Sequence, residues 1–370
     1  MTHADTLIVG GGIIGAACAR ALAVAGQHVE LVDAGPTPGA ATAASAGMLA
    51  PLADTHGQDP LLSLRIRARD LYRELVPALE DETGIEIGLW TDGIVQVAFT
   101  AADADRLKGD IAWQRQQGFP VDWLAADELR ERCPGISPEA VGAHLSPEDG
   151  ALEPPALIDA LIRSATAHGA TLRRGERVEE VLIEAGRVVA VRTTRGRIEA
   201  GQVLIAAGCW SGRVGGLPRP LSVEPVRGQM AALEWPPGEP RAIVFADHGY
   251  VLTRGGEAIV GSTMEHAGFD ASVTDDAINH LLTTARRIYP ALDLTSERRR
   301  WAGLRPATPD GRPMIGCDPQ IPNLWYATGH GRNGILLAAI TGQIIAALVT
   351  GQPVEYNLVP LSPGRFWTEP

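Results

Sequence analysis

The chain has 370 residues, of which 45% are hydrophobic and 21% are charged, a composition typical of globular proteins and not of disordered or fibrous ones. The length predicts two structural units. A formal net charge of −12 disfavours nucleic acid and a membrane surface as partners, because no cluster of Lys or Arg offsets it.

The cysteine pattern suggests neither a disulfide framework nor a metal site. No CxxC pair occurs, and the scattered thiols are Cys18, Cys133, Cys209 and Cys317. The N-terminus enters a short apolar strand without the basic start of a secretory signal, which predicts a cytoplasmic location.

The first 35 residues read as one βαβ half-unit. A strand is expected at 6–10, a helix of small residues up to about Ala25, and a second strand at 28–33. Further apolar strands are expected at 203–207 and 324–328, and each runs into a glycine. This arrangement is typical of strands that end at a ligand-binding edge.

The segments between these strands have a different character. A polar helix is expected at 101–118, and the antiparallel strands are expected at 94–99, 229–234, 250–253 and 258–262. The stretch 236–240, rich in Pro and Gly, predicts a hairpin loop of that sheet. The fold class is therefore α/β with two domains, a Rossmann-like domain interleaved with an antiparallel-sheet domain.

One apolar run, at residues 335–349, could be read as a membrane span or as a buried core helix. It is shorter than the roughly 20 residues that cross a bilayer, and it contains Gly342 and Gln343. We expect a buried core helix.

Gly10, Gly12 and Gly15 form a GxGxxG pattern between the first strand and the first helix. The first glycine permits a tight turn, the second lets the backbone approach a pyrophosphate, and the third lets helix and strand pack closely. Asp33 is placed to accept hydrogen bonds from a ribose diol, which disfavours NADP. The fingerprint alone leaves FAD and NAD open. An NAD dehydrogenase would continue with βα units, whereas this chain continues with a loop of small residues at 43–51. Small side chains let the main chain lie against a flat ring system, so this loop favours FAD.

Matching segments spread through the chain carry a resemblance to a known family: LIVGGGIIGAACARALA, SAGMLAP, VLIAAGCWSG, VEPVRGQM, IVGSTMEHAGFD, WAGLRPATPDGRPMIG and GHGRNGILLA. With them the chain resembles the glycine oxidases of the D-amino-acid oxidase family, flavoenzymes that also include sarcosine oxidase. The resemblance implies an FAD-binding domain at 1–85, 145–222 and 300–370 and a substrate-binding domain at 86–144 and 223–299.

The resemblance also implies which residues hold FAD. They are Gly10, Gly12, Ile13, Ile14, Gly15, Asp33, Ala34, Ala44, Ser45, Ala46, Gly47, Met48, Val178, Ala207, Gly208, Trp210, Arg305, Gly331, Arg332, Asn333, Gly334 and Ile335. Sarcosine oxidases attach FAD through a cysteine in the segment that corresponds to 301–310. This chain has none there, so noncovalent FAD is expected.

For the substrate, the resemblance implies that Arg305 and Tyr250 bind an amino-acid carboxylate and that Arg332 lies at the pocket. A planar guanidinium suits a carboxylate. The implied reaction moves a hydride from a small amino acid to flavin N5, gives an imine and then an oxo acid and ammonia, and uses oxygen to form hydrogen peroxide. For His330 we expect a structural hydrogen bond.

Several alternatives stay open at this point. A dehydrogenase of the same fold would pass electrons to a quinone or dye. Glycine oxidases often carry an aromatic residue where this chain has Gly331, which predicts a wider pocket and leaves glycine, sarcosine and small D-amino acids as substrates. The resemblance is compatible with a role in thiamine biosynthesis and with assembly as a homo-oligomer.

Overall fold

The computed structural model describes residues 4–37, 39–55, 57–236, 241–246 and 249–367. Its first sheet contains β1 (Ala4–Val9), β2 (Val29–Asp33), β8 (Thr171–Arg174), β11 (Gly196–Ile205), β17 (Met314–Cys317) and β18 (Leu324–Thr328). The order is β17-β18-β11-β1-β2-β8, and all neighbours are parallel except β17 and β18. Leu7, Ile8 and Val9 of β1 are buried, as expected for a strand covered on both faces.

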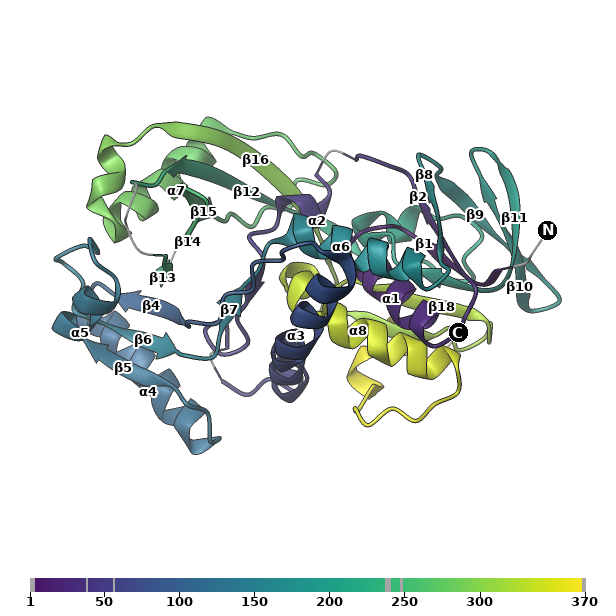
Figure 1. Cartoon of the computed structure of the whole chain (residues 1–370), viewed down its shortest axis with the longest axis horizontal. Coiled ribbons are helices and arrows are strands. Elements are labelled where there is room, and N and C mark those ends of the chain that lie inside the picture. The colour runs from purple at the N-terminus through teal and green to yellow at the C-terminus, as the bar shows by residue number, and fades with distance from the viewer. Residues whose placement is uncertain (1–3, 38, 56, 237–240, 247–248, 368–370) are drawn as a thin grey trace.

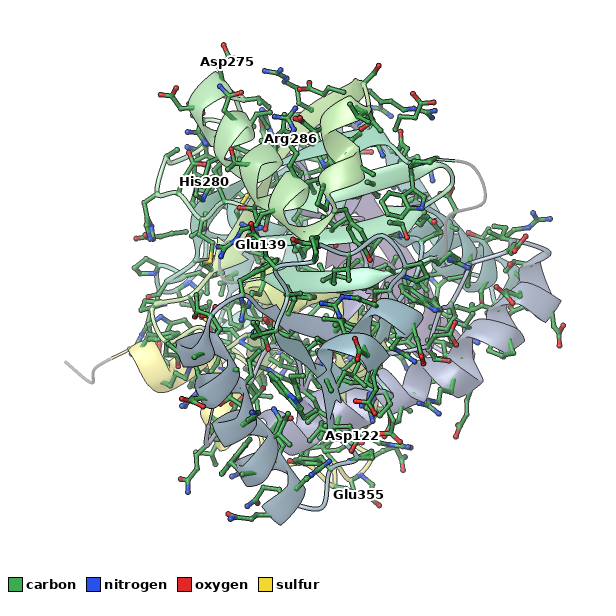
Figure 2. All side chains as sticks on the ribbon, turned by 90° about the vertical axis from the view of Figure 1, so that its left-hand side faces the viewer. Asp122, Glu139, Asp275, His280, Arg286 and Glu355 are labelled. Carbon is green, nitrogen blue, oxygen red and sulfur yellow. The ribbon has the colours of Figure 1, made fainter. Side chains whose placement is uncertain are left out.

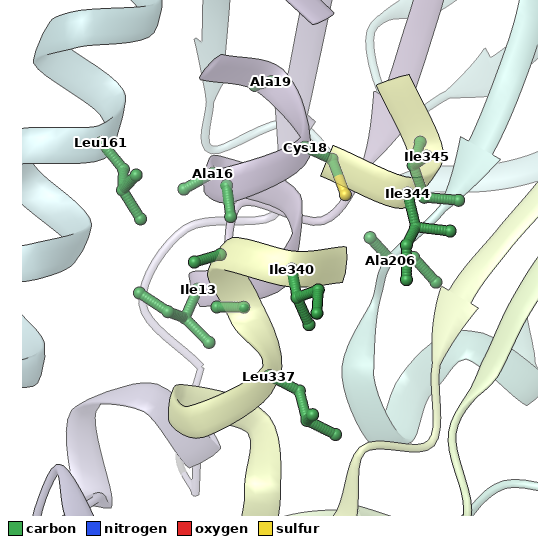
Figure 3. Close-up of a cluster of buried hydrophobic side chains, with 14 of the residues drawn as sticks. Ile13, Ala16, Cys18, Ala19, Leu161, Ala206, Leu337, Ile340, Ile344 and Ile345 are labelled. Carbon is green, nitrogen blue, oxygen red and sulfur yellow. The ribbon is translucent and has the colours of Figure 1, made fainter. Parts of the chain in front are cut away.

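Helices cover one side of this sheet (Figure 1). They are α1 (Ile13–Val24), α3 (Leu62–Thr83), α6 (Pro154–Ala167) and α8 (Gly334–Val349). Figure 3 shows Ala16 and Cys18 of α1 beside Ile340 and Ile344 of α8 in a shared apolar core. A Cβ on Gly342 would lie 2.7 Å from the carbonyl oxygen of Ala17, so the small residue sets how closely the two helices approach.

The burial of α8 explains its apolar composition. By its length and composition alone, the stretch Gly331–Val349 could cross a membrane. In the fold, however, its side chains from Ile335 to Ile340 pack against α1 and α3 in the interior. The predicted core helix at 335–349 is therefore confirmed.

The second sheet has the order β16-β12-β15-β14-β13-β4-β6-β5 and is antiparallel except between β13 and β4. Its strands are β4 (Ile94–Ala98), β5 (Asp122–Ala125), β6 (Gly142–Ser146), β12 (Glu224–Glu234), β13 (Ile243–Ala246), β14 (Gly249–Arg254), β15 (Glu257–Gly261) and β16 (Glu297–Ala307). Helix α7 (Asp275–Ile288) buries Ile278, Leu281 and Ala285 against it, while Figure 2 shows Asp275 and His280 on the outer surface of that helix.

Smaller elements complete the chain. The α-helices are α2 (Ala41–Ala44), α4 (Ala101–Gln116) and α5 (Ala126–Arg132), and the short 3₁₀ helices are η1 (Gly208–Arg213), η2 (Pro290–Leu294), η3 (Gly331–Asn333), η4 (Val359–Leu361) and η5 (Pro363–Phe366). A hairpin of β9 (Val178–Glu184) and β10 (Arg187–Thr193) extends from β11, and β3 (Met48–Leu49) pairs with β7 (Gly150–Ala151).

The predicted α/β class and its Rossmann-like interleaved arrangement are confirmed. Some local predictions need correction. The strand expected at 203–207 ends at Ile205, because the chain turns there towards η1. The loop expected at 43–51 includes the end of α2 and all of β3. The hairpin loop at 236–240 falls almost wholly outside the described residues.

The division into two domains stays a prediction. The hydrogen bonding does show that β16 crosses the boundary proposed at residue 300 and pairs along its length with β12. Residues 300–307 therefore belong to the second sheet. Arg305 is thus carried by a strand of the second sheet, and it lines the cavity described below.

Candidate active site

A single cavity of about 1650 Å³ runs from the carboxyl ends of β1 and β2 to the face of the second sheet. The predicted site residues that line it are Gly10, Gly12, Ile13, Ile14, Asp33, Ala34, Ala44, Ser45, Ala46, Gly47, Met48, Val178, Ala207, Gly208, Trp210, Tyr250, Arg305, Gly331, Arg332, Asn333, Gly334 and Ile335. The fold thus brings together residues that are far apart in the sequence. Gly15 alone of the predicted set lies behind the wall.

The glycine fingerprint has the geometry of a cradle. Gly10 has a φ of +105°, and a Cβ there would lie 2.6 Å from the carbonyl oxygen of Ala206. A Cβ on Gly15 would lie 1.9 Å from the carbonyl oxygen of Gly10, so this glycine lets α1 pack against the turn. Gly12 has open space on the cavity side, with only Thr42 Oγ1 within 4 Å. The turn is therefore shaped for close approach by a ligand.

Asp33 closes this end of the cavity. Its Oδ2 accepts a hydrogen bond of 2.7 Å from the Gly11 amide, and its Oδ1 accepts one of 2.8 Å from the Gly35 amide. A carboxylate has about four acceptor positions, so two are left for hydroxyl groups. The cradle, the free helix start and this carboxylate fit an adenosine dinucleotide.

The middle of the cavity is bordered by main chain with small side chains. Gly47 has a φ of +84°, and a Cβ there would lie 2.0 Å from the carbonyl oxygen of Leu152. Side chains of the second sheet hold this stretch in place. Arg254 Nη1 donates to the carbonyl oxygens of Leu152 at 2.9 Å and Ala46 at 3.3 Å, and Trp301 Nε1 donates to that of Ala44 at 3.1 Å.

The opposite wall begins at η3 and the start of α8, where no side chain caps the helix. The unpaired amides of a helix start favour negative charge. His330 precedes this turn and is buried, with Nε2 hydrogen-bonded to Thr341 Oγ1 at 3.1 Å. Burial lowers the pKa of His330 to about 3, so its ring is neutral near pH 7. This hydrogen bond is the structural contact expected for His330.

At the far end, Arg305 of β16 lies half-buried, with no carboxylate partner among the described residues. Its Nη1 donates to the carbonyl oxygen of Thr263 at 3.0 Å, and its Nη2 donates to Ser262 Oγ at 2.6 Å. Burial lowers the pKa of Arg305, and the nearby Arg332 lowers it further. A partly desolvated guanidinium that meets no acid among the described residues is suited to an external anion.

Tyr250 lies beside this guanidinium. Burial raises the pKa of its phenol to about 12, although the charge of Arg305 acts in the opposite direction. Its ring packs against Phe245 with centroids 5.4 Å apart. The hydroxyl is therefore protonated near neutral pH and can donate a hydrogen bond to an anion held by Arg305.

Arg332 forms an ion pair of 2.8 Å with Asp54, which also lines the cavity. Sequence reasoning missed this partner, because nothing in the local pattern around Asp54 marks it. It also missed Thr42, whose Oγ1 accepts the Ile13 amide at 3.1 Å, and Gly228, against which Arg305 lies. Gly228 stands within the segment VEPVRGQM but just before the strand expected at 229–234, which in the structure begins earlier, at Glu224.

Comparison with known proteins places this geometry in context. The model of the family "FAD dependent oxidoreductase" matches residues 5–348. A glycine oxidase of Geobacillus kaustophilus (strain HTA426) is 35% identical over 367 residues, which are 98% of this chain and 97% of that protein.

Two solved structures are similar over nearly their whole length. The crystal structure of glycine oxidase from Geobacillus kaustophilus has a TM-score of 0.94 at 34% identity and covers 99% of this chain and 100% of that chain. The crystal structure of iminodiacetate oxidase from Chelativorans sp. BNC1 has a TM-score of 0.90 at 30% identity and covers 97% of this chain and 98% of that chain.

Proposed function

Because this chain belongs to the family of FAD-dependent oxidoreductases, we propose that it oxidises the carbon–nitrogen bond beside the carboxylate of a small amino acid. The observation that carries this proposal is the half-buried guanidinium of Arg305, which lines the end of the cavity, makes two hydrogen bonds and has no acidic partner among the described residues. A carboxylate is the anion that matches its planar donors.

The residues of the cavity fit FAD. The glycine turn and the start of α1 would hold the pyrophosphate, and Asp33 would hold a ribose. The main chain around Ala46 and Gly47 would face the flavin ring, and the start of α8 would lie at its far edge. When bound, FAD supplies the acceptor for the hydride that leaves the substrate carbon.

The remaining chemistry of the chain is orientation. Arg305 binds the carboxylate and Tyr250 donates its phenol hydrogen to the same group, which fixes the plane of the substrate. Burial lowers the pKa of His330 to about 3, which makes its ring a weak base, so the α-hydrogen is not assigned to His330 as a proton. The amine loses its proton to solvent before the α-hydrogen leaves with its electron pair. Water then converts the imine into an oxo acid and ammonia, or into an oxo acid and a primary amine when the substrate is a secondary amine.

Oxygen is the proposed electron acceptor, as the similarity to glycine oxidases suggests. The test is a screen of glycine, sarcosine and small D-amino acids, in which hydrogen peroxide formed in air is compared with dye reduced under argon. We expect one peroxide for each amine consumed in air. Dye reduction without peroxide would assign the chain to the dehydrogenases, and no turnover with either acceptor would reject amine oxidation.

A further inference from the structure

The guanidinium groups of Arg305 and Arg332 both line the cavity, yet they differ in their partners. Arg332 is close enough to Arg305 to lower its pKa. Arg305 has no acidic partner among the described residues, whereas Arg332 is paired with Asp54 at 2.8 Å. Within this group of three, the charges of Asp54 and Arg332 offset each other, and the charge of Arg305 stays available for one carboxylate.

Asp54 is held in place through hydrogen bonds to the backbone of the residues on either side of it. The carboxylate of Asp149 accepts hydrogen bonds from the amides of Leu52 at 3.0 Å and Ala53 at 2.9 Å. Gln114 Nε2 donates to the carbonyl oxygens of Leu52 at 3.0 Å and Thr55 at 3.1 Å. The segment that carries Asp54 is thus held from both sides by buried polar side chains.

These buried side chains come from elsewhere in the fold. Asp149 is fully buried and pairs with Arg69 of α3 at 3.1 Å, and Gln114 belongs to α4. A loop anchored in this way keeps its acidic side chain at the cavity wall. The side chain of Asp54 is 20% exposed, compared with 52% for Arg332, so the acid is the more deeply held member of the pair.

From this arrangement we propose that Asp54 is a specificity-determining residue that limits the substrate to a single carboxylate. It occupies the Arg332 guanidinium and places a negative charge where a second substrate carboxylate would enter. Like charges at one site oppose binding, and a repulsive group is a common means of excluding a competing ligand. Without the charge of Asp54, Arg332 becomes a second carboxylate site beside Arg305.

This inference rests on the proposed function, and it specifies which amino acids and amines that function accepts. Amines with one carboxylate, such as glycine and sarcosine, meet Arg305 alone. Dicarboxylic amines such as iminodiacetate and D-aspartate bring a second anion to the paired Arg332. The wild-type enzyme should therefore favour the first class strongly.

The test is Asp54→Asn in the FAD-loaded enzyme, with sarcosine and iminodiacetate as a matched pair of secondary amines. The ratio of kcat/KM for iminodiacetate over that for sarcosine should rise by at least about tenfold. The double variant Asp54→Asn with Arg332→Gln should lose this gain. An unchanged ratio in Asp54→Asn, or a gain that persists in the double variant, would overturn the proposal.

Asp59→Asn is the matched control. Asp59 pairs with Arg65 at 2.8 Å and has the same exposed fraction as Asp54, 20%, but does not line the cavity. Its substitution should leave the ratio as in the wild type. A ratio that rises equally in this control would assign the effect to loop stability and overturn the proposal.

A binding measurement separates this inference from the proposed function. Calorimetric titration with acetate and with malonate reports carboxylate binding without any turnover. Asp54→Asn should strengthen malonate binding relative to acetate by about tenfold, even if the enzyme oxidises none of the amines tested. Equal relative affinities in wild type and variant would contradict the role of Asp54, whatever the outcome of the turnover assays.

Discussion

The guanidinium of Arg305 lies flat against Gly228 of the neighbouring strand. A Cβ on Gly228 would come within 2.2 Å of Nη1, 2.4 Å of Nη2 and 2.5 Å of Cζ. The strands β12 and β16 pair with Gly228 opposite Gly303, so the arginine crosses the strand at a point where no side chain stands. The missing side chain at position 228 is therefore what permits the position of Arg305.

Gly228→Ala should displace this guanidinium and weaken substrate binding. We expect KM for the amino acid to rise by at least about tenfold, because the guanidinium must move away from the added methyl group and no longer meets the substrate carboxylate correctly. Bound FAD should be retained, and steady-state kinetics with flavin absorbance measures both effects. Gly109→Ala in α4, where a Cβ meets nothing within 4 Å, is the control. An unaltered KM in Gly228→Ala would mean that the carboxylate binds elsewhere.

Asp33→Ala should weaken FAD binding. The substitution removes the acceptor that faces the ribose and also frees the amides of Gly11 and Gly35. Loss of hydrogen bonds to a charged group costs about 1.5–3 kcal/mol, which corresponds to at least about tenfold in the dissociation constant. Fluorescence titration of the apoprotein with FAD measures it.

Asp5→Ala serves as the control for this substitution, because Asp5 also accepts a backbone hydrogen bond, from His28 at 2.9 Å, but lies outside the cavity. Its FAD affinity should equal that of the wild type. If Asp33→Ala binds FAD as tightly as Asp5→Ala does, the assignment of Asp33 to the cofactor is wrong.

The buried His330 should make stability depend on pH. Its pKa falls from 6.5 to about 3 on folding, so the unfolded chain binds the extra proton between these values. This contribution to the free energy of unfolding is present above about pH 6.5 and is lost as pH falls towards 3. His330→Asn should therefore show a shallower loss of Tm between pH 6.5 and 4 than the wild type. Parallel Tm curves for the two proteins would contradict a neutral buried ring.

FAD should leave the protein completely on denaturation. Residues 301–310 contain no cysteine, and the next one, Cys317, does not line the cavity. Precipitation with acid followed by absorbance of the supernatant and the pellet measures the partition. We expect all flavin in the supernatant. Yellow colour that stays with the pellet after washing would show a covalent link.

The sequence allowed the cofactor end of the cavity to be predicted because its signals are local. Gly10, Gly12, Gly15 and Asp33 lie within one βαβ unit, and their spacing has a direct geometric meaning. The family and the need for FAD, which were predicted from the resemblance, are confirmed by the family match and by the glycine oxidase relatives.

The substrate end of the cavity was harder to predict from the sequence, because its contacts join distant parts of the chain. Arg305 and Tyr250 were found through the resemblance alone, and their roles stay predictions. The pair of Asp54 with Arg332 depends on a loop fixed by Asp149 and Gln114, and no spacing in the sequence reports such an arrangement. The membership of β16 in the second sheet likewise depends on its pairing with β12.

The most direct test of amino-acid oxidation is anaerobic mixing of the FAD-loaded enzyme with glycine, sarcosine or D-alanine while flavin absorbance is followed. We expect loss of the oxidised flavin absorbance at a rate that saturates with substrate concentration. Arg305→Gln, with its flavin still bound, should need at least about a tenfold higher concentration to reach half of its limiting rate. Persistent oxidised flavin with every amine, or identical concentration dependence in Arg305→Gln, would contradict the account.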